Sequence, residues 1–402
     1  MDAPHPLRAA VRGESEEDDF QGEAWYMRIG ILTFWWSNDN YGQLLQCYAL
    51  QKFLRDAGHE AFVIRYDYTS DIPTTPFPVR CLKAMNPARL LRFVLYKKHL
   101  RDVVREQKAN DRHFDDFRDQ YIEWSEDTYP SYADLRGNPP DADAYIVGSD
   151  QVWNYWFAST KRFYNPAHAY FLDFGDGGTK RLAYAASWGV TELPEDFIRA
   201  VTPLLARFGY IGVREESGAD LCRLCGRDDA EWVCDPTLLL GAERYRALWR
   251  EEDARGNVRK PGKKYLLLYM LSNECGFDIQ SAYDFAASRN LEVVYVTGNG
   301  VIDGREKYFA TIPEWLYLVD SAEYVVTNSF HCGVFSSVFR KAFGIVPLTG
   351  KYEGMNARFE SLFELLGTGA RYVSDGDFSV LDAPYETREV RVSQRFLSVL
   401  GR

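Results

Sequence analysis

The sequence predicts an α/β protein made of two Rossmann-like domains, each with a mostly parallel sheet. Its 402 residues exceed what one ordinary hydrophobic core holds together. Short apolar runs typical of buried strands alternate with helical patterns, and this order builds parallel sheets. A charged stretch at residues 251–264 separates two such sets. We therefore expect an N-terminal domain over 27–250, a linker over 251–264 and a C-terminal domain over 265–402, facing each other across a cleft.

The first domain opens with a β-loop-α-β unit. The apolar run Arg28–Phe34 predicts a strand, and apolar residues recurring near a 3.6 period predict a helix from Gly42 to Ala57. Gly58 ends this helix, and Ala61–Tyr66 predicts the second strand. Further strands are expected at Ala144–Gly148, Arg181–Ser187, Tyr210–Val213 and Ala230–Cys234, with helices near 195–207 and 216–225 between them.

The second domain repeats the alternation after the charged stretch. Strands are expected at Tyr265–Met270, Leu291–Thr297, Tyr324–Thr327 and Gly344–Leu348, with helices at Asp278–Arg289, Pro313–Val319 and Cys332–Lys341.

Residues 80–112 form a basic helical segment with two interpretations. They hold ten Lys or Arg against three Asp or Glu, and Phe93, Tyr96, Leu100, Val103 and Val104 share one stripe. Such a surface suits peripheral contact with anionic lipid or with a diphosphate-linked substrate. The alternative, which we favour, is a helix packed on the core with a solvated basic face.

Composition restricts the protein's location and partners. The formal charge of −11 argues against a general nucleic-acid binder, and no apolar run reaches the ~20 residues that span a bilayer. Residues 1–26 are acidic and lack a signal-peptide pattern, so we expect a disordered tail with the folded protein starting near Met27. The scattered cysteines indicate a reducing cytoplasm. Cys222, Cys225 and Cys234 lack a fourth ligand nearby, so no metal site is expected.

Polar residues recur at the ends of the predicted strands, where ligands bind in open α/β sheets. A dinucleotide site is poorly supported, since Gly298 and Gly300 are followed by Gly304, one residue too far for the usual spacing. Arg214 follows a strand and could bind a carboxylate or phosphate, or could form an ion pair with Glu215, Glu216 or another acid. His331 opens a helix after a strand, where its near-neutral pKa suits acid–base work. Arg358 is a further cationic candidate, and Asn328 and Ser329 lie shortly before the histidine. Turn or cap roles remain alternatives for the polar residues after the other strands: Asn40, Tyr41, Ser149, Asp150, Gln151, Trp153 and Ser187.

Eight segments in order along residues 27–372 resemble the polysaccharide pyruvyl transferase family. They are RIGILTF, NDNYGQLLQCYALQKFLRDAGHEAFVIRY, DAYIVGSDQVWN, KRLAYAAS, IGVREESGADL, VCDPTLLL, TNSFHCGVFSSVF and NARFESLFELLG. The resemblance implies a GT-B-like arrangement of the two domains. It also implies transfer of the enolpyruvyl group of phosphoenolpyruvate to a sugar as a pyruvate ketal, with release of phosphate, in exopolysaccharide or capsule synthesis.

Residue roles follow from this resemblance as hypotheses. His331 is expected to be the general acid or to assist the departure of phosphate, and Asp150 to be the base for the acceptor hydroxyl. Phosphoenolpyruvate serves as co-substrate, and no further cofactor or metal is expected. The acceptor is a saccharide, free or linked to a lipid diphosphate on the inner face of the membrane. The donor would be held by Arg214, Arg358, Asn328 and Ser329, and the acceptor by Asn40, Tyr41, Ser149, Gln151, Trp153 and Ser187.

One departure keeps an alternative open. The motif that the segment TNSFHCGVFSSVF resembles has Arg two residues before the histidine in many family members, whereas this chain has Ser329 there. Either another cation supplies that charge or the donor differs. A GT-B-like glycosyltransferase that uses a nucleotide sugar is the alternative, with its nucleotide near Gly298–Gly304 and His331. A glycan-binding protein without catalysis is a second one.

Overall fold

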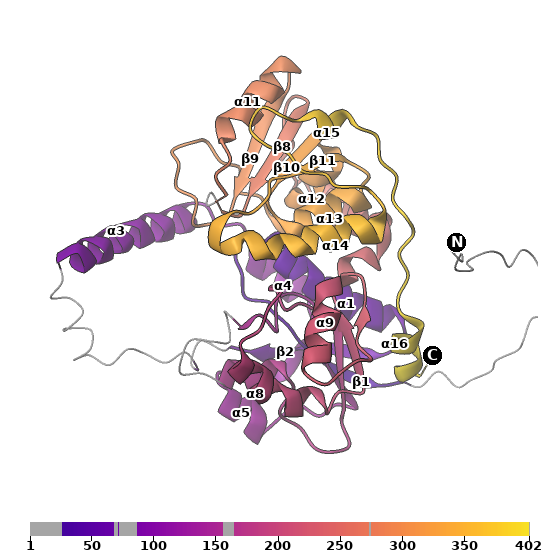
Figure 1. The fold of residues 1–402 in the computed structure, drawn as a ribbon. Helices are drawn as coiled ribbons and strands as arrows, with labels where there is room; N and C mark the ends of the chain where they lie inside the picture. The colour runs from indigo at the N-terminus through magenta and orange to yellow at the C-terminus, as the bar shows by residue number, and fades with distance from the viewer. Residues whose placement is uncertain (1–25, 68–70, 72–86, 156–164, 273–274, 402) are drawn as a thin grey trace, which may run out of the picture.

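The computed structural model describes residues 26–67, 71, 87–155, 165–272 and 275–401, so the predicted tail lies outside the described residues except for Tyr26. The first half of the chain builds a seven-stranded parallel sheet, with strand order β3-β2-β1-β4-β5-β6-β7 (Figure 1). Its strands are β1 (Arg28–Leu32), β2 (Glu60–Tyr66), β3 (Trp124–Tyr129), β4 (Ala144–Val147), β5 (Lys180–Ala186), β6 (Tyr210–Val213) and β7 (Glu231–Trp232).

The second half builds a four-stranded parallel sheet in the order β11-β10-β8-β9. Its strands are β8 (Tyr265–Met270), β9 (Glu292–Thr297), β10 (Tyr324–Thr327) and β11 (Ala342–Ile345). All four were predicted, because strands covered by helices on both faces are continuous apolar runs. The predicted fold class, α/β with two mostly parallel sheets, is confirmed.

Helices connect the strands and cover both sheets (Figure 1). In the first half they are α1 (Tyr41–Asp56), α3 (Pro87–Ala109), α4 (Phe114–Tyr121), α5 (Tyr132–Gly137), α7 (Asn165–Tyr170), α8 (Glu195–Leu205), α9 (Glu216–Leu224), η2 (Pro236–Leu238) and α10 (Gly241–Ala254). In the second half they are α11 (Ile279–Ser288), α12 (Ile312–Ser321), α13 (Phe330–Val338), η3 (Gly350–Asn356), α14 (Ala357–Leu366), α15 (Ser379–Asp382) and α16 (Gln394–Val399).

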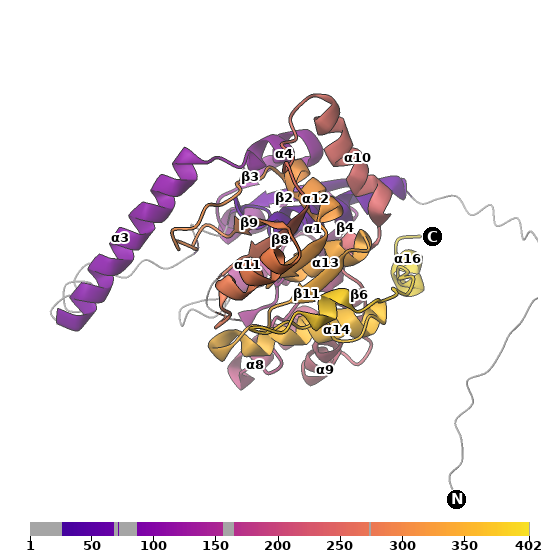
Figure 2. The ribbon, with the colours of Figure 1, turned by 90° about the horizontal axis from the view of Figure 1, so that it is seen from above.

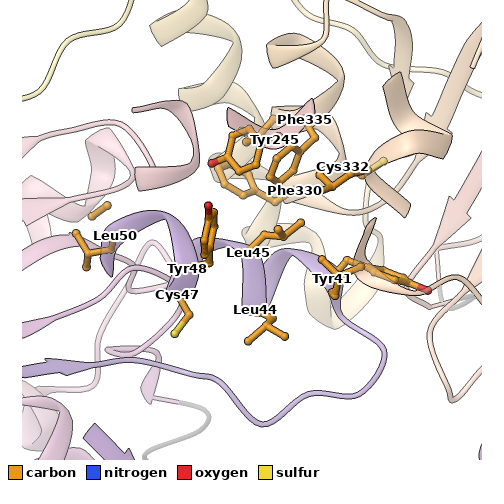
Figure 3. Close-up of a cluster of buried hydrophobic side chains, with 14 of the residues drawn as sticks. Tyr41, Leu44, Leu45, Cys47, Tyr48, Leu50, Tyr245, Phe330, Cys332 and Phe335 are labelled. Carbon is orange, nitrogen blue, oxygen red and sulfur yellow. The ribbon is translucent and has the colours of Figure 1, made fainter. Parts of the chain in front are cut away.

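Helix α1 joins the two halves into one continuous core. Twelve of its 16 residues are buried, as expected for a helix covered on all sides. Figure 3 shows Leu45 and Tyr48 pointing toward Tyr245 and Phe330, while Leu44 points the opposite way. Because α1 also packs against α13, the first turn of α1 lies beside elements of the second half.

The end of the chain returns to the first sheet. Helix α16 packs against β6, and the Phe396 ring lies 4.5 Å from that of Tyr184 and 5.3 Å from that of Tyr210. Helix α10 continues to Ala254, into the stretch predicted as a linker, and packs against α12. The domain boundaries themselves stay a prediction.

Helix α3 does not pack on the core, so the interpretation we favoured for residues 80–112 is wrong. The helix extends away from the rest of the molecule in both views (Figures 1 and 2). Phe93, Tyr96, Leu100 and Val104 of the predicted apolar stripe are exposed. Residues 80–86 lie outside the described part. Among the helices that the structure describes, none has the length and hydropathy needed to cross a membrane.

Candidate active site

The order of strands reverses at one place in each sheet, and these places position the site. In the first sheet the reversal lies between β1 and β4, and in the second between β8 and β10. Crevices beyond the carboxyl ends of such strands bind ligands. The second reversal is bridged by Asn328, whose Oδ1 accepts from the Leu271 N–H at 2.8 Å and whose Nδ2 donates to the Ser272 carbonyl at 2.6 Å.

A buried aspartate, Asp235, lies at the centre of a polar cluster. It follows β7 and caps η2, where its Oδ1 accepts from the Thr237 N–H at 3.0 Å and from the Thr237 hydroxyl at 2.7 Å. Its Oδ2 accepts from the Ser149 hydroxyl at 2.8 Å and from Arg214 Nη1 at 3.1 Å. The same oxygen lies 3.5 Å from His331 Nε2, so residues of both halves converge on one carboxylate.

Arg214 is buried and lies close to three carboxylates. Its Nε donates to Glu215 Oε1 at 3.2 Å, which also accepts from the Ser187 hydroxyl at 2.7 Å. Its Nη2 lies 3.8 Å from Asp150 Oδ1. Burial alone lowers the pKa of Arg214, but Glu215 and Asp235 outweigh it, so the net shift is upward. The ion pair with Glu215, one of the alternatives for Arg214, is thus present in the structure.

Arg358 supplies the second guanidinium, from the first turn of α14. A cation at a helix N-terminus is opposed by the helix dipole. Its Nε donates to the Met355 carbonyl at 3.1 Å, and no carboxylate of the described residues lies within ion-pair distance of it. Burial and the charge of Arg214 lower the pKa of Arg358 to about 10. Both guanidiniums lie over the Phe330 ring, at 4.5 Å for Arg214 and 5.8 Å for Arg358.

We call Asp150, Arg214, Glu215, Asp235, His331 and Arg358 the Asp235 cluster. Burial raises the pKa of Asp235, but His331 and Arg214 outweigh it and hold that pKa well below its ordinary value. The Asp235 cluster thus brings two guanidiniums and one imidazole to three carboxylates.

His331 is held between two helix N-termini. It is the second residue of α13, whose cap is Ser329, with the side chain accepting from the Cys332 N–H at 3.4 Å. Gly42 in the first turn of α1 lies so close that a Cβ there would be 2.2 Å from His331 Cβ. Only a residue without a side chain fits at this contact.

Three polar atoms of the Asp235 cluster are buried without a hydrogen-bond partner among the described residues. They are Arg214 Nη2, Glu215 Oε2 and His331 Nε2. Leaving such an atom unpaired costs about 1–3 kcal/mol, so three in one place indicate a site prepared for a ligand. Asp150 adds a φ of 70°, a conformation that residues other than glycine rarely adopt and that concentrates at functional sites.

Other predicted residues lie near this cluster in supporting positions. Ser149 and Ser187 are fully buried and bond to its carboxylates. Asn40 caps α1, and Gln151 Oε1 accepts from the Asn154 amide at 2.7 Å. Asn328 and Ser329 hold the loop after β10 in the way described above.

Two predicted acceptor-binding residues are buried in the cores instead. The Tyr41 hydroxyl donates to the Ala310 carbonyl at 2.8 Å, and its ring stacks on Trp315 at 5.1 Å. The Trp153 indole donates to the Tyr170 carbonyl at 3.0 Å and stacks on Phe171. Both side chains are fully buried, so neither ring is available to an acceptor in this arrangement.

A cavity of about 780 Å³ lies elsewhere, between α4 and the loops before α12. Its lining includes His113, Tyr121, Asn257 and Tyr308 but none of the predicted site residues. We place the candidate site at the Asp235 cluster, because charge, partnerless polar atoms and strand reversal coincide there.

Sequence reasoning missed Asp235 as a site residue and treated Glu215 only as a partner for Arg214. The signal for Asp235 was the Asp-Pro pair directly after a short strand, inside one of the motifs quoted above. No group of three or more His, Cys, Asp or Glu able to hold a metal ion occurs within the described ranges, and Cys222, Cys225 and Cys234 are buried.

Residues 40–347 match the sequence model of a family described as polysaccharide pyruvyl transferase. No curated protein sequence matches the chain significantly. Among solved structures, UDP-GlcNAc 2-epimerase from Methanocaldococcus jannaschii, in complex with UDP-GlcNAc and UDP, is similar, with 11% identity and a TM-score of 0.50 over 93% of this chain and 99% of that one. A putative UDP-N-acetylglucosamine 2-epimerase from Listeria monocytogenes has 11% identity and a TM-score of 0.47, over 89% and 86% of the two chains. An α-glucosyltransferase in complex with UDP and DNA has 10% identity and a TM-score of 0.43, over 94% and 100%. The predicted GT-B-like fold is thereby confirmed.

Proposed function

Because the chain belongs to the polysaccharide pyruvyl transferase family, we propose that it transfers the enolpyruvyl group of phosphoenolpyruvate to a saccharide. The product is a pyruvate ketal on two hydroxyls of the sugar, and inorganic phosphate is released. The observation that carries the proposal is the Asp235 cluster, which combines a histidine, two guanidiniums and carboxylates in one buried place.

The reaction sets clear demands on a site. A proton must reach the methylene carbon of phosphoenolpyruvate, which leaves a cationic carbon at C2. One sugar hydroxyl adds to C2, the C2–O bond to phosphate breaks, and the second hydroxyl closes the ketal. The two hydroxyl protons balance the proton that C3 gains and the proton that phosphate carries away. The site therefore needs an acid, a base and cations for the carboxylate and phosphate.

The residues of the Asp235 cluster can meet these demands. His331 Nε2 has no hydrogen-bond partner among the described residues and lies 3.5 Å from Asp235 Oδ2, so His331 is the proposed acid. Asp150 is the proposed base. Arg358 is the proposed main ligand for the carboxylate or phosphate of the donor. Arg214 already donates to carboxylates through Nε and Nη1, so only its Nη2 is left to donate to a ligand.

The Asp235 cluster is buried between the two halves of the chain. A ligand can therefore reach it only if the two halves move apart. His331 and Arg358 come from the second half, whereas the three carboxylates and Arg214 come from the first. A cytoplasmic location, the lack of a further cofactor and a lipid-linked acceptor stay predictions.

Calorimetric titration with phosphoenolpyruvate tests the proposal, with UDP-sugars in parallel. We expect phosphoenolpyruvate to bind and the Arg358→Gln variant to lose about tenfold to a hundredfold in affinity, since a charge-assisted contact disappears. Arg199→Gln, at an arginine side chain that is 71% exposed on α8, is the control and should bind normally. Binding of a UDP-sugar without binding of phosphoenolpyruvate would favour the glycosyltransferase alternative.

A further inference from the structure

Helix α3 is a basic and apolar arm that the proposed reaction does not use. Its C-terminal end is attached to the second half, where Lys307 Nζ donates to Glu106 Oε1 at 2.8 Å and the Lys307 side chain is only 4% exposed. From there the helix extends away from the rest of the molecule, so its N-terminal end lies farthest out (Figures 1 and 2).

The outer end of α3 exposes an unusual amount of apolar surface. Leu91, Phe93, Val94, Leu95 and Tyr96 are each between 52 and 60% exposed. Seven of the ten large hydrophobic side chains that are exposed in the described structure lie on α3. Gathered apolar surface of this kind marks an interaction site, whereas scattered single residues do not.

The arrangement of these apolar side chains favours insertion into lipid over binding in a groove of a partner protein. Successive residues of an α-helix point about 100° apart, so the four consecutive residues 93–96 cover every side of the helix. A protein groove covers one face of a bound helix and would leave the others in water. A lipid phase surrounds an inserted segment on all sides.

Positive charge lies directly beside the apolar end. Lys97, Lys98, Arg101 and Arg105 are exposed along the next turns. Residues 87–109 carry seven Lys or Arg and two Asp or Glu, a net +5 in a chain of −11. Lysines and arginines near a membrane surface are attracted by anionic headgroups, while apolar side chains enter the acyl boundary.

We propose that α3 is a membrane-docking arm that inserts Leu91 and Phe93–Tyr96 into an anionic phospholipid surface. Lys97, Lys98, Arg101 and Arg105 then lie at the level of the lipid phosphates. This proposal stands independently of the pyruvyl transfer reaction, because no residue of α3 belongs to the Asp235 cluster.

Co-sedimentation of the purified full chain with vesicles tests the proposal. The vesicles contain phosphatidylcholine with about one third phosphatidylglycerol, or phosphatidylcholine alone. We expect binding to the anionic vesicles that weakens as salt rises from about 0.05 to about 0.5 M, and much weaker binding to the neutral ones. The Phe93→Ser/Leu95→Ser variant should bind at least tenfold more weakly. The Lys97→Gln/Lys98→Gln variant should bind roughly thirtyfold more weakly, since each lysine strengthens binding about fivefold.

Matched controls separate docking from loss of folding. Leu224→Ser changes a leucine on α9 that is 63% exposed, and Arg199→Gln/Arg223→Gln changes two exposed arginines on α8 and α9. These controls should bind vesicles like the original chain, and all variants should keep its melting temperature. The proposal is overturned if anionic vesicles do not bind, or if the α3 variants bind them normally. It is also overturned if the chain is a dimer that Phe93→Ser/Leu95→Ser converts to a monomer, since a second copy would then occupy this surface.

Discussion

The contact between Gly42 and His331 gives the sharpest test of how the site is built. An alanine at Gly42 would place its Cβ 2.2 Å from His331 Cβ and 2.4 Å from Nδ1. Ordinary carbon contacts are about 3.5–4.0 Å, so either α1 and α13 separate by about 1.5 Å or the imidazole is displaced. A misplacement of about 1 Å in a reacting group costs roughly a hundredfold in rate. We therefore expect Gly42→Ala to lower turnover about a hundredfold.

The stability of this variant should fall by at most about 2 kcal/mol. Overpacking costs about 1–3 kcal/mol, while alanine in a helix gains roughly 1 kcal/mol over glycine. The assay is release of phosphate from phosphoenolpyruvate, combined with a melting curve. Gly137→Ala at the end of α5 is the control, because a Cβ there meets nothing within 4 Å. Normal turnover and a raised melting temperature in Gly42→Ala would show that this contact does not position His331.

Three further substitutions test the Asp235 cluster and the packing of α16. Replacing Asp235 by Asn leaves Arg214 and His331 without their shared carboxylate, and we expect urea unfolding to show a loss of about 3–5 kcal/mol. Folding lowers the pKa of Asp235, so its contribution to stability is present above the unfolded value of about 3.9 and is lost as pH falls through the lowered one. Unfolding of the Asp235→Asn variant should therefore depend less on pH in this acidic range, and an unchanged dependence would contradict that assignment. Replacing His331 by Ala should lower turnover about 10²–10⁴-fold with phosphoenolpyruvate affinity nearly kept, as kinetics and calorimetry would show, and near-normal turnover would exclude its role as acid. Replacing Phe396 by Ala removes the contact of α16 with Tyr184, and we expect a loss of about 3 kcal/mol in denaturant unfolding, where an unchanged midpoint would mean that α16 does not stabilise the sheet.

The sequence predicted most of the strands because buried parallel strands are continuous apolar runs. It missed β3, whose sequence Trp124–Tyr129 contains three successive exposed residues and lies at the edge of the sheet. It also did not place α16 against β6, since this contact joins residues nearly 200 positions apart, and periodicity carries only local information.

The candidate site could be predicted only in part. The positions of His331 and Arg214 after strands led to their selection, and the structure brings both side chains to Asp235, since carboxyl ends of parallel strands meet at one edge of a sheet. Their roles stay predictions. Tyr41 and Trp153 also follow strands, but helix and loop direct their rings into the cores rather than toward the Asp235 cluster. The convergence on Asp235 depends on how the two halves pack, which no local pattern encodes. Likewise, the spacing of apolar residues in 80–112 predicts a helix with an apolar stripe but does not determine whether that stripe packs on the core.

Pyruvyl transfer is tested most directly by following both products of the reaction in one incubation. The protein is mixed with phosphoenolpyruvate and a panel of saccharide acceptors, and phosphate release is measured together with the mass of each saccharide. We expect phosphate release matched by a saccharide whose mass rises by one pyruvate less one water, and we expect Arg358→Gln to lose both products. Sugar transfer from a UDP-sugar, with phosphoenolpyruvate left unchanged, would contradict this expectation.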